Sequence, residues 1–160
     1  MIKNPGEINL EDSLKICQET LNKARAEGFM PLTVTVIDVA GVIRATLSED
    51  GSGPIRAKIA YAKAWTCLAF SVSTNKLRDI FEDQPRLDKA IAGMQTMADG
   101  NLVPTPGGLI IQKNGKNIGS IGVTGDRSDQ DEIAGIAGIQ AAGFTAVSYT
   151  HLTLPTILLV

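Results

Sequence analysis

The sequence has few of the residue types that bind nucleic acids or carry out common hydrolytic chemistry. Only 4% of its 160 residues are aromatic, its net charge is −2, and no basic run is longer than a pair. Nucleic-acid binding, which depends on base stacking and many phosphate contacts, is therefore excluded as its main function. The one histidine is His151, close to the C-terminus. The rest of the chain thus lacks a Ser–His–Asp triad, a Cys–His pair and most kinds of zinc site.

Membrane and secretion signals are also missing. No apolar run approaches membrane-spanning length, and the first residues lack the apolar centre of a signal peptide. Cys17 and Cys67 lie in helical patterns without metal-ligand spacing, which predicts buried free thiols. We therefore expect a cytoplasmic protein with no membrane partner, no nucleic-acid partner and no metal site.

What is present indicates one α+β domain with helices packed on an antiparallel sheet. The composition is 44% hydrophobic and 20% charged, which is typical of a globular domain. Helical and alternating apolar spacing, with turn residues between them, give the element boundaries. The expected elements are a helix over 10–27, a half-buried strand over 32–38, a strand over 42–47, helices over 55–70 and 75–81, a helical turn or two within 84–100, strands over 109–111 and 118–123, and a helix over 128–142.

The most informative stretch runs from residue 106 to residue 142. Gly107 and Gly108 allow the close approach of another group, and Asn114-Gly115 predicts a tight hairpin turn. The last helix then begins at Ser128 or Asp129, either of which can cap it. Two turns and a helix N-terminus converge at one end of this hairpin. We expect a ligand there, and an anion is favoured by the backbone N–H groups.

Five motifs, taken together in this order, resemble the GlcG/HbpS-like family, which includes the C-terminal domain of PduO-type corrinoid proteins. The resemblance covers about residues 10–144. The motifs are VIDVAG (36–41), EDGSG (49–53), AYAKAWT (60–66), PGG (106–108) and IGVTGDRSDQDEIA (121–134).

The resemblance implies a profilin-like α+β fold that assembles into dimers and commonly octamers, and a ligand that in some relatives is haem or a corrinoid. The haem-binding relatives use a histidine ligand, and residues 1–146 contain none. Met30, Met94, Met97 and Tyr61 are the remaining candidate iron donors, so we expect weak or no haem binding. The family's ligand-binding positions fall on Asp50, Lys63, Gly107, Gly108, Gly125, Gln130 and Asp131.

Three functions stay open from the sequence. The leading one is a homo-oligomeric protein that binds a small anionic metabolite or a tetrapyrrole between the Gly107-Gly108 turn, the Gly125 turn and Lys63. The second is a lyase or isomerase acting on a small oxo or hydroxy acid, with Lys63 or Asp131 as the acid or base. The third is a purely structural oligomer in which the glycines serve packing.

The last residues form a separate unit in this interpretation. Residues 1–146 are expected to form the domain, and residues 147–160, VSYTHLTLPTILLV, to be an atypical apolar tail. Their bare apolar end resembles translated vector or frameshifted sequence. We therefore give His151 no functional role.

The resemblance and the small-residue helix over 55–70 predict self-association. We expect at least a dimer, and an octamer built from dimers, because small side chains let identical chains approach closely. Light scattering at micromolar concentration, with residues 147–160 removed, measures the mass. A monomer under these conditions contradicts the prediction.

Overall fold

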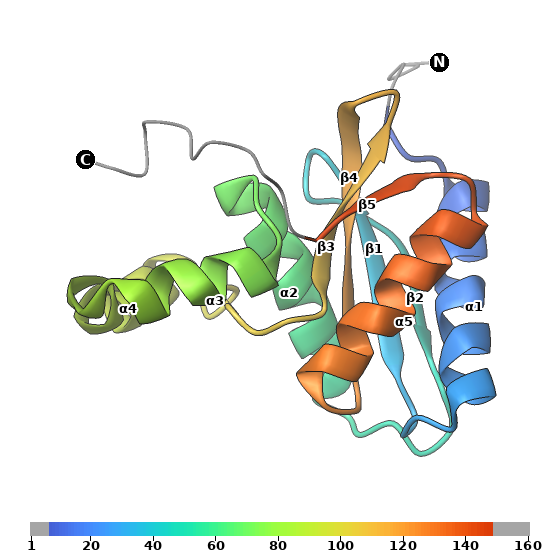
Figure 1. Ribbon diagram of the computed structural model, residues 1–160, viewed down its shortest axis with the longest axis horizontal. Helices are drawn as coiled ribbons and strands as arrows, with labels where there is room; N and C mark the ends of the chain where they lie inside the picture. Colours follow the sequence, from blue (N-terminus) through green and yellow to red (C-terminus); the bar gives the residue numbers. More distant parts are fainter. Residues whose placement is uncertain (1–6, 149–160) are drawn as a thin grey trace.

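The computed structural model describes residues 7–148, without the side chains of residues 85 and 88, and contains one antiparallel sheet in the order β2-β1-β4-β3-β5. The α+β fold with helices packed on an antiparallel sheet is confirmed (Figure 1). The elements are α1 (Leu10–Glu27), β1 (Thr33–Asp38), β2 (Ile43–Ser48), α2 (Arg56–Phe70), α3 (Thr74–Asp83), α4 (Pro85–Met97), β3 (Gly108–Lys113), β4 (Lys116–Thr124), α5 (Ser128–Ala141) and β5 (Thr145–Val147).

Local sequence signals set several boundaries as predicted. The Asn9 side chain accepts a hydrogen bond from the Asp12 N–H at 2.7 Å, and Gly28 ends α1 with φ of 70°. The turn between β3 and β4 has positive φ at both Asn114 and Gly115, 52° and 74°. This is the conformation that an Asn-Gly hairpin turn requires.

The sheet is covered on both faces. Helices α1 and α5 lie side by side on one face, and α2 lies on the other (Figure 1). Val34 and Val36 of β1 pack into the core with Ile16 of α1 and Ile139 of α5. All six residues of β1 are buried, so the prediction of a half-buried strand is wrong. Apolar and threonine side chains do alternate along β1, but α2 covers the face of the sheet that carries the threonines, so both faces are buried.

Helix α2 approaches the sheet unusually closely at β4. A Cβ atom on Gly122 would lie only 1.8 Å from the Ala60 carbonyl oxygen. Two residues earlier in β4, the Ser120 hydroxyl donates a hydrogen bond of 2.8 Å to the Ala64 carbonyl. The small residues of β4 and α2 therefore fix the helix against the strand, and the opposite side of α2 faces outwards.

Helices α3 and α4 extend away from the sheet (Figure 1). Helix α4 is longer than the one or two turns predicted, because Leu87, Ile91 and Met94 pack against an apolar cluster that includes Leu77 and Phe81. The chain then returns beside α2 through the 99–103 loop. No helix in the described part of the chain is long and apolar enough to span a membrane.

The hydroxyl of Thr66 on α2 holds this returning loop. Its proton is shared between the Ala62 carbonyl of α2 at 2.7 Å and the Asn101 carbonyl at 2.9 Å, and its oxygen accepts from the Val103 N–H at 2.9 Å. The position of the 99–103 loop relative to α2 is thereby fixed.

The expected boundary after residue 146 falls inside a short strand. In β5, Val147 pairs with Ile110 of β3, so the sheet includes one residue of the predicted tail. Residues 149–160 of that tail, with His151, lie outside the described residues. Its division from the domain stays a prediction.

The contact between α2 and β4 predicts opposite effects for two glycine-to-alanine substitutions. Gly122→Ala should lower the free energy of unfolding by more than about 2 kcal/mol, because the new methyl group meets backbone atoms that cannot move aside. Gly93→Ala, in α4 with open space around it, should raise it by up to about 1 kcal/mol. Urea unfolding of both variants measures the effects, and equal stabilities would contradict the prediction.

Candidate functional site

Two of the predicted site residues form a buried ion pair between α2 and α5. The Lys63 Nζ atom lies 3.1 Å from Asp131 Oδ2 and donates hydrogen bonds of 2.8 Å to the carbonyl oxygens of Pro106 and Val123. The Lys63 and Asp131 side chains are only 3% and 2% exposed. The lysine therefore joins the 106–107 turn, the end of β4 and the start of α5.

Glycine is required beside this ion pair, as the sequence predicted, but the group that approaches belongs to the chain itself. Gly107 has φ of 115°, and a Cβ atom there would lie 2.5 Å from the Val123 carbonyl oxygen and 2.9 Å from Lys63 Nζ. The N–H of Gly108 donates to the Thr74 hydroxyl at 2.8 Å. The Gly108 N–H and the Lys63 amine, both expected to attract an anion, are thus engaged in bonds within the fold.

Burial governs the electrostatics of this pair. It lowers the pKa of Lys63, although the adjacent Asp131 carboxylate favours the charged amine. It likewise raises the pKa of Asp131, against the effect of Lys63. Desolvation therefore outweighs the mutual attraction of the two charges, as is common for buried ion pairs.

The start of α5 differs from its prediction. The N-cap is Arg127, not Ser128 or Asp129, and no side chain caps the helix. Asp129 is exposed and accepts a 2.8 Å hydrogen bond from Arg127, which lowers the pKa of its carboxyl group. Asp131 reaches back to accept from the Asp126 N–H at 3.0 Å. The Asp131 carboxylate thus satisfies a backbone N–H group just before the start of α5.

The remaining predicted residues are dispersed around this pair. Gly125 packs against the chain before β1, where a Cβ atom would lie 2.3 Å from the Pro31 carbonyl oxygen. The side-chain amide of Gln130 faces the Asp126 carboxylate. Asp50 lines a polar recess with Arg25 and Glu49, and this recess is separate from the buried pair.

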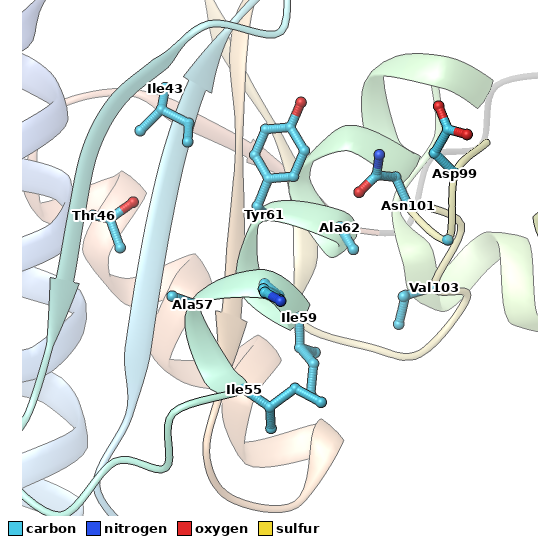
Figure 2. Close-up of a pocket in the computed structure, with 12 residues that line it drawn as sticks. Ile43, Thr46, Ile55, Ala57, Ile59, Tyr61, Ala62, Asp99, Asn101 and Val103 are labelled. Carbon is cyan, nitrogen blue, oxygen red and sulfur yellow. The ribbon is translucent and has the colours of Figure 1, made fainter.

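A cavity of about 500 Å³ lies on the outward side of α2. It is bounded by α2, by β2 and by the 99–103 loop (Figure 2). Its walls are mostly apolar, with a few polar groups. The lining residues are Ile43, Thr46, Ile55, Ala57, Lys58, Ile59, Tyr61, Ala62, Asp99, Gly100, Asn101 and Val103.

This cavity was not predicted from the sequence because its residues come from three separate segments. Ile55 looked like an ordinary first residue of a helix, and the Thr66 bonds that hold the 99–103 loop beside α2 cannot be read from the sequence. The sequence held one signal for the cavity. The isoleucines at positions 55 and 59 lie on the outward side of α2, away from the small residues that pack on the sheet.

The candidate iron donors named from the sequence separate in the structure. Tyr61 lines the large cavity, whereas Met94 and Met97 line a smaller apolar cavity of about 230 Å³ beside Trp65. Met30 follows the C-terminal end of α1, and its N–H donates a hydrogen bond to the Asp126 carboxylate. Within residues 7–148, no three His, Cys, Asp or Glu side chains come together in a geometry that could hold a metal ion.

Comparison with known proteins gives consistent matches. The family model of haem-degrading HbpS-like proteins matches residues 8–140. The corrinoid adenosyltransferase PduO of Salmonella typhimurium is 28% identical over 127 residues, which are 79% of this chain and 36% of that protein. An uncharacterised 15.0 kDa protein of Citrobacter freundii is 29% identical over 126 residues, covering 79% of this chain and 85% of that one. The chain spans about a third of the length of the adenosyltransferases that it matches.

Solved structures share the fold. The crystal structure of a PduOC–haem complex superposes with a TM-score of 0.77 at 23% identity, covering 89% of this chain and 99% of that chain. The crystal structure of HbpS gives a TM-score of 0.73 at 24% identity, with 89% and 94% covered.

The Lys63–Asp131 pair predicts strong non-additivity. Lys63→Met and Asp131→Asn should each lower the free energy of unfolding by about 3–5 kcal/mol, because each leaves a buried charge or acceptor without its partner. The double variant should cost less than the sum of the two.

A double-mutant cycle by urea unfolding measures this coupling. The exposed pair Lys23–Glu27 is the control, and its disruption by Lys23→Ala should cost less than about 0.5 kcal/mol. Additive losses at Lys63 and Asp131 would show that the two side chains act independently.

Proposed function

Because the chain belongs to the HbpS-like family of haem-degrading proteins, we propose that it is a small-molecule-binding protein whose ligand is a tetrapyrrole. The observation that carries this proposal is the cavity of about 500 Å³ between α2, β2 and the 99–103 loop. Mostly apolar cavities of this size with a few polar groups are the usual sites for small molecules and cofactors.

The chemistry of the cavity suits such a ligand. A tetrapyrrole combines a flat apolar ring system with carboxylate or amide groups at its edge. Ile43 and Ile55 supply apolar surface and are 53% and 62% exposed, while Lys58 supplies an exposed cation for a carboxylate. A small anionic metabolite would leave most of this apolar wall in water, so the larger ligand is favoured.

The relatives support the same ligand class. One solved structure of this fold is a haem complex, and two of the relatives are corrinoid adenosyltransferases. The chain matches only about a third of those enzymes, so their transfer reaction is not part of this proposal.

Self-association belongs to the proposed function. Exposed isoleucines that gather beside a cavity are typical of a contact surface, and a second copy lying over them would close the cavity from solvent. We therefore propose a dimer through this face. The octamer and the cytoplasmic location remain predictions from the resemblance and from the free cysteines.

The other two functions have less support. An enzyme that used Lys63 or Asp131 as its acid or base would have to break a buried ion pair to reach a substrate, since both side chains are almost inaccessible. The tight contacts at Gly107, Gly108 and Gly122 agree with a packing role for the glycines. A purely structural oligomer, however, gives no reason for an apolar cavity beside α2.

The cavity predicts a substitution that separates ligand binding from folding. Metal-free protoporphyrin should quench the fluorescence of Trp65, the only tryptophan of the chain, in a saturable way. Ile55→Glu should weaken this binding about tenfold or more, because it places a charge against the ring system.

Ile133→Glu is the matched control. Ile133 is also an exposed isoleucine, 47% exposed, but it lies on α5 and does not line the cavity. Its substitution should leave porphyrin affinity unchanged. Equal effects of the two substitutions, or no saturable quenching of the wild-type protein, would overturn the proposed function.

A further inference from the structure

Tyr61 has an unusual position in the cavity. It rises from α2 between Ile43 of β2 and Asn101 of the 99–103 loop, with Ile55 and Val103 below it (Figure 2). Its hydroxyl group makes no hydrogen bond to any other residue of the described range 7–148. Tyr61 is half-buried, so its hydroxyl can be reached from the cavity. The oxygen is therefore available to a bound molecule.

We propose that the Tyr61 oxygen is the axial ligand of ferric haem in this cavity, an inference that rests on the proposed tetrapyrrole function. Tyrosine is an established axial ligand of haem iron in proteins. As the oxygen–iron bond forms, the phenol loses its proton to solvent, and the charged phenolate is matched to the ferric ion. No change in oxidation state is involved.

Two charged residues lie near Tyr61 in the cavity lining. Lys58 lies one turn earlier on the same side of α2, and Asp99 lies in the loop across the cavity. Asp99 is the one side chain of the cavity lining that carries a carboxylate, so it is the competing oxygen donor to be tested.

The other common donors are excluded by position within the described residues. Cys17 and Cys67 are buried free thiols whose pKa is raised by burial to about 12, so neither supplies a thiolate. Met94 and Met97 line the smaller cavity beside Trp65, and Met30 lies near Asp126. This assignment reverses our sequence-based expectation of weak haem binding, which rested on the absence of histidine from residues 1–146.

Iron ligation by Tyr61 implies that the cavity distinguishes haem from a porphyrin without iron. The proposed function requires only that the ring system fits. The bond to Tyr61 adds affinity for ferric haem alone. A single oxygen atom therefore accounts for the difference in affinity between ferric haem and metal-free porphyrin.

The test compares two ligands and two proteins in the full chain. Ferric haem bound to the wild-type protein should show the absorption and resonance Raman bands of a phenolate–iron complex. Tyr61→Phe keeps the ring and removes the oxygen, so it should abolish these bands and weaken ferric haem binding about tenfold or more. The affinity for metal-free protoporphyrin should stay the same within about twofold.

Two further variants test the competing donors. Asp99→Asn and His151→Ala should both retain the phenolate bands, since neither residue ligates the iron in this proposal. Loss of the bands in either variant, or an unchanged haem spectrum in Tyr61→Phe, would overturn the assignment of Tyr61. If metal-free protoporphyrin binds all variants and the haem spectrum is the same in the wild-type protein and in Tyr61→Phe, this inference fails and the proposed function stands. If protoporphyrin does not bind at all, both fail.

Discussion

The close contact between α2 and β4 is the constraint on which the rest of the molecule depends. Because residue 122 is glycine, the backbone of α2 lies directly against the strand, with no side chain between them. This places Lys63 deep enough to reach two carbonyl groups and a carboxylate on three other segments. The same helix then turns Lys58 and Tyr61 towards solvent, where they line the cavity. One helix thus serves a buried structural role on one side and carries the candidate binding surface on the other.

The sequence predicted the framework well because its signals are local. Asn9, Gly28 and Asn114-Gly115 fix the ends of elements through bonds or backbone angles that involve only near neighbours. Errors arose where a distant segment decides the outcome. The cover over β1 comes from α2, and the length of α4 depends on its packing against the cluster with Leu77 and Phe81.

The candidate site was predicted less well than the fold, and for a related reason. The structure brings Lys63, Gly107 and Asp131 together, but a sequence does not reveal that three partners satisfy the lysine and leave it inaccessible. Tyr61 appeared among four possible iron donors with nothing to distinguish them. Only the return of the 99–103 loop beside α2, held by Thr66, places Tyr61 in a cavity and the methionines elsewhere.

The buried pair of Lys63 and Asp131 has a consequence for how this chain can change over evolutionary time. Exchange of either residue alone leaves an uncompensated charge or unsatisfied carbonyl groups in the interior, at a cost comparable to a large part of a domain's total stability. A lineage can leave this arrangement only by changing both positions nearly together. Such a pair persists because each residue restricts the other, even where no ligand or substrate ever touches it. Invariance of these two positions in a set of relatives would therefore be no sign of catalysis.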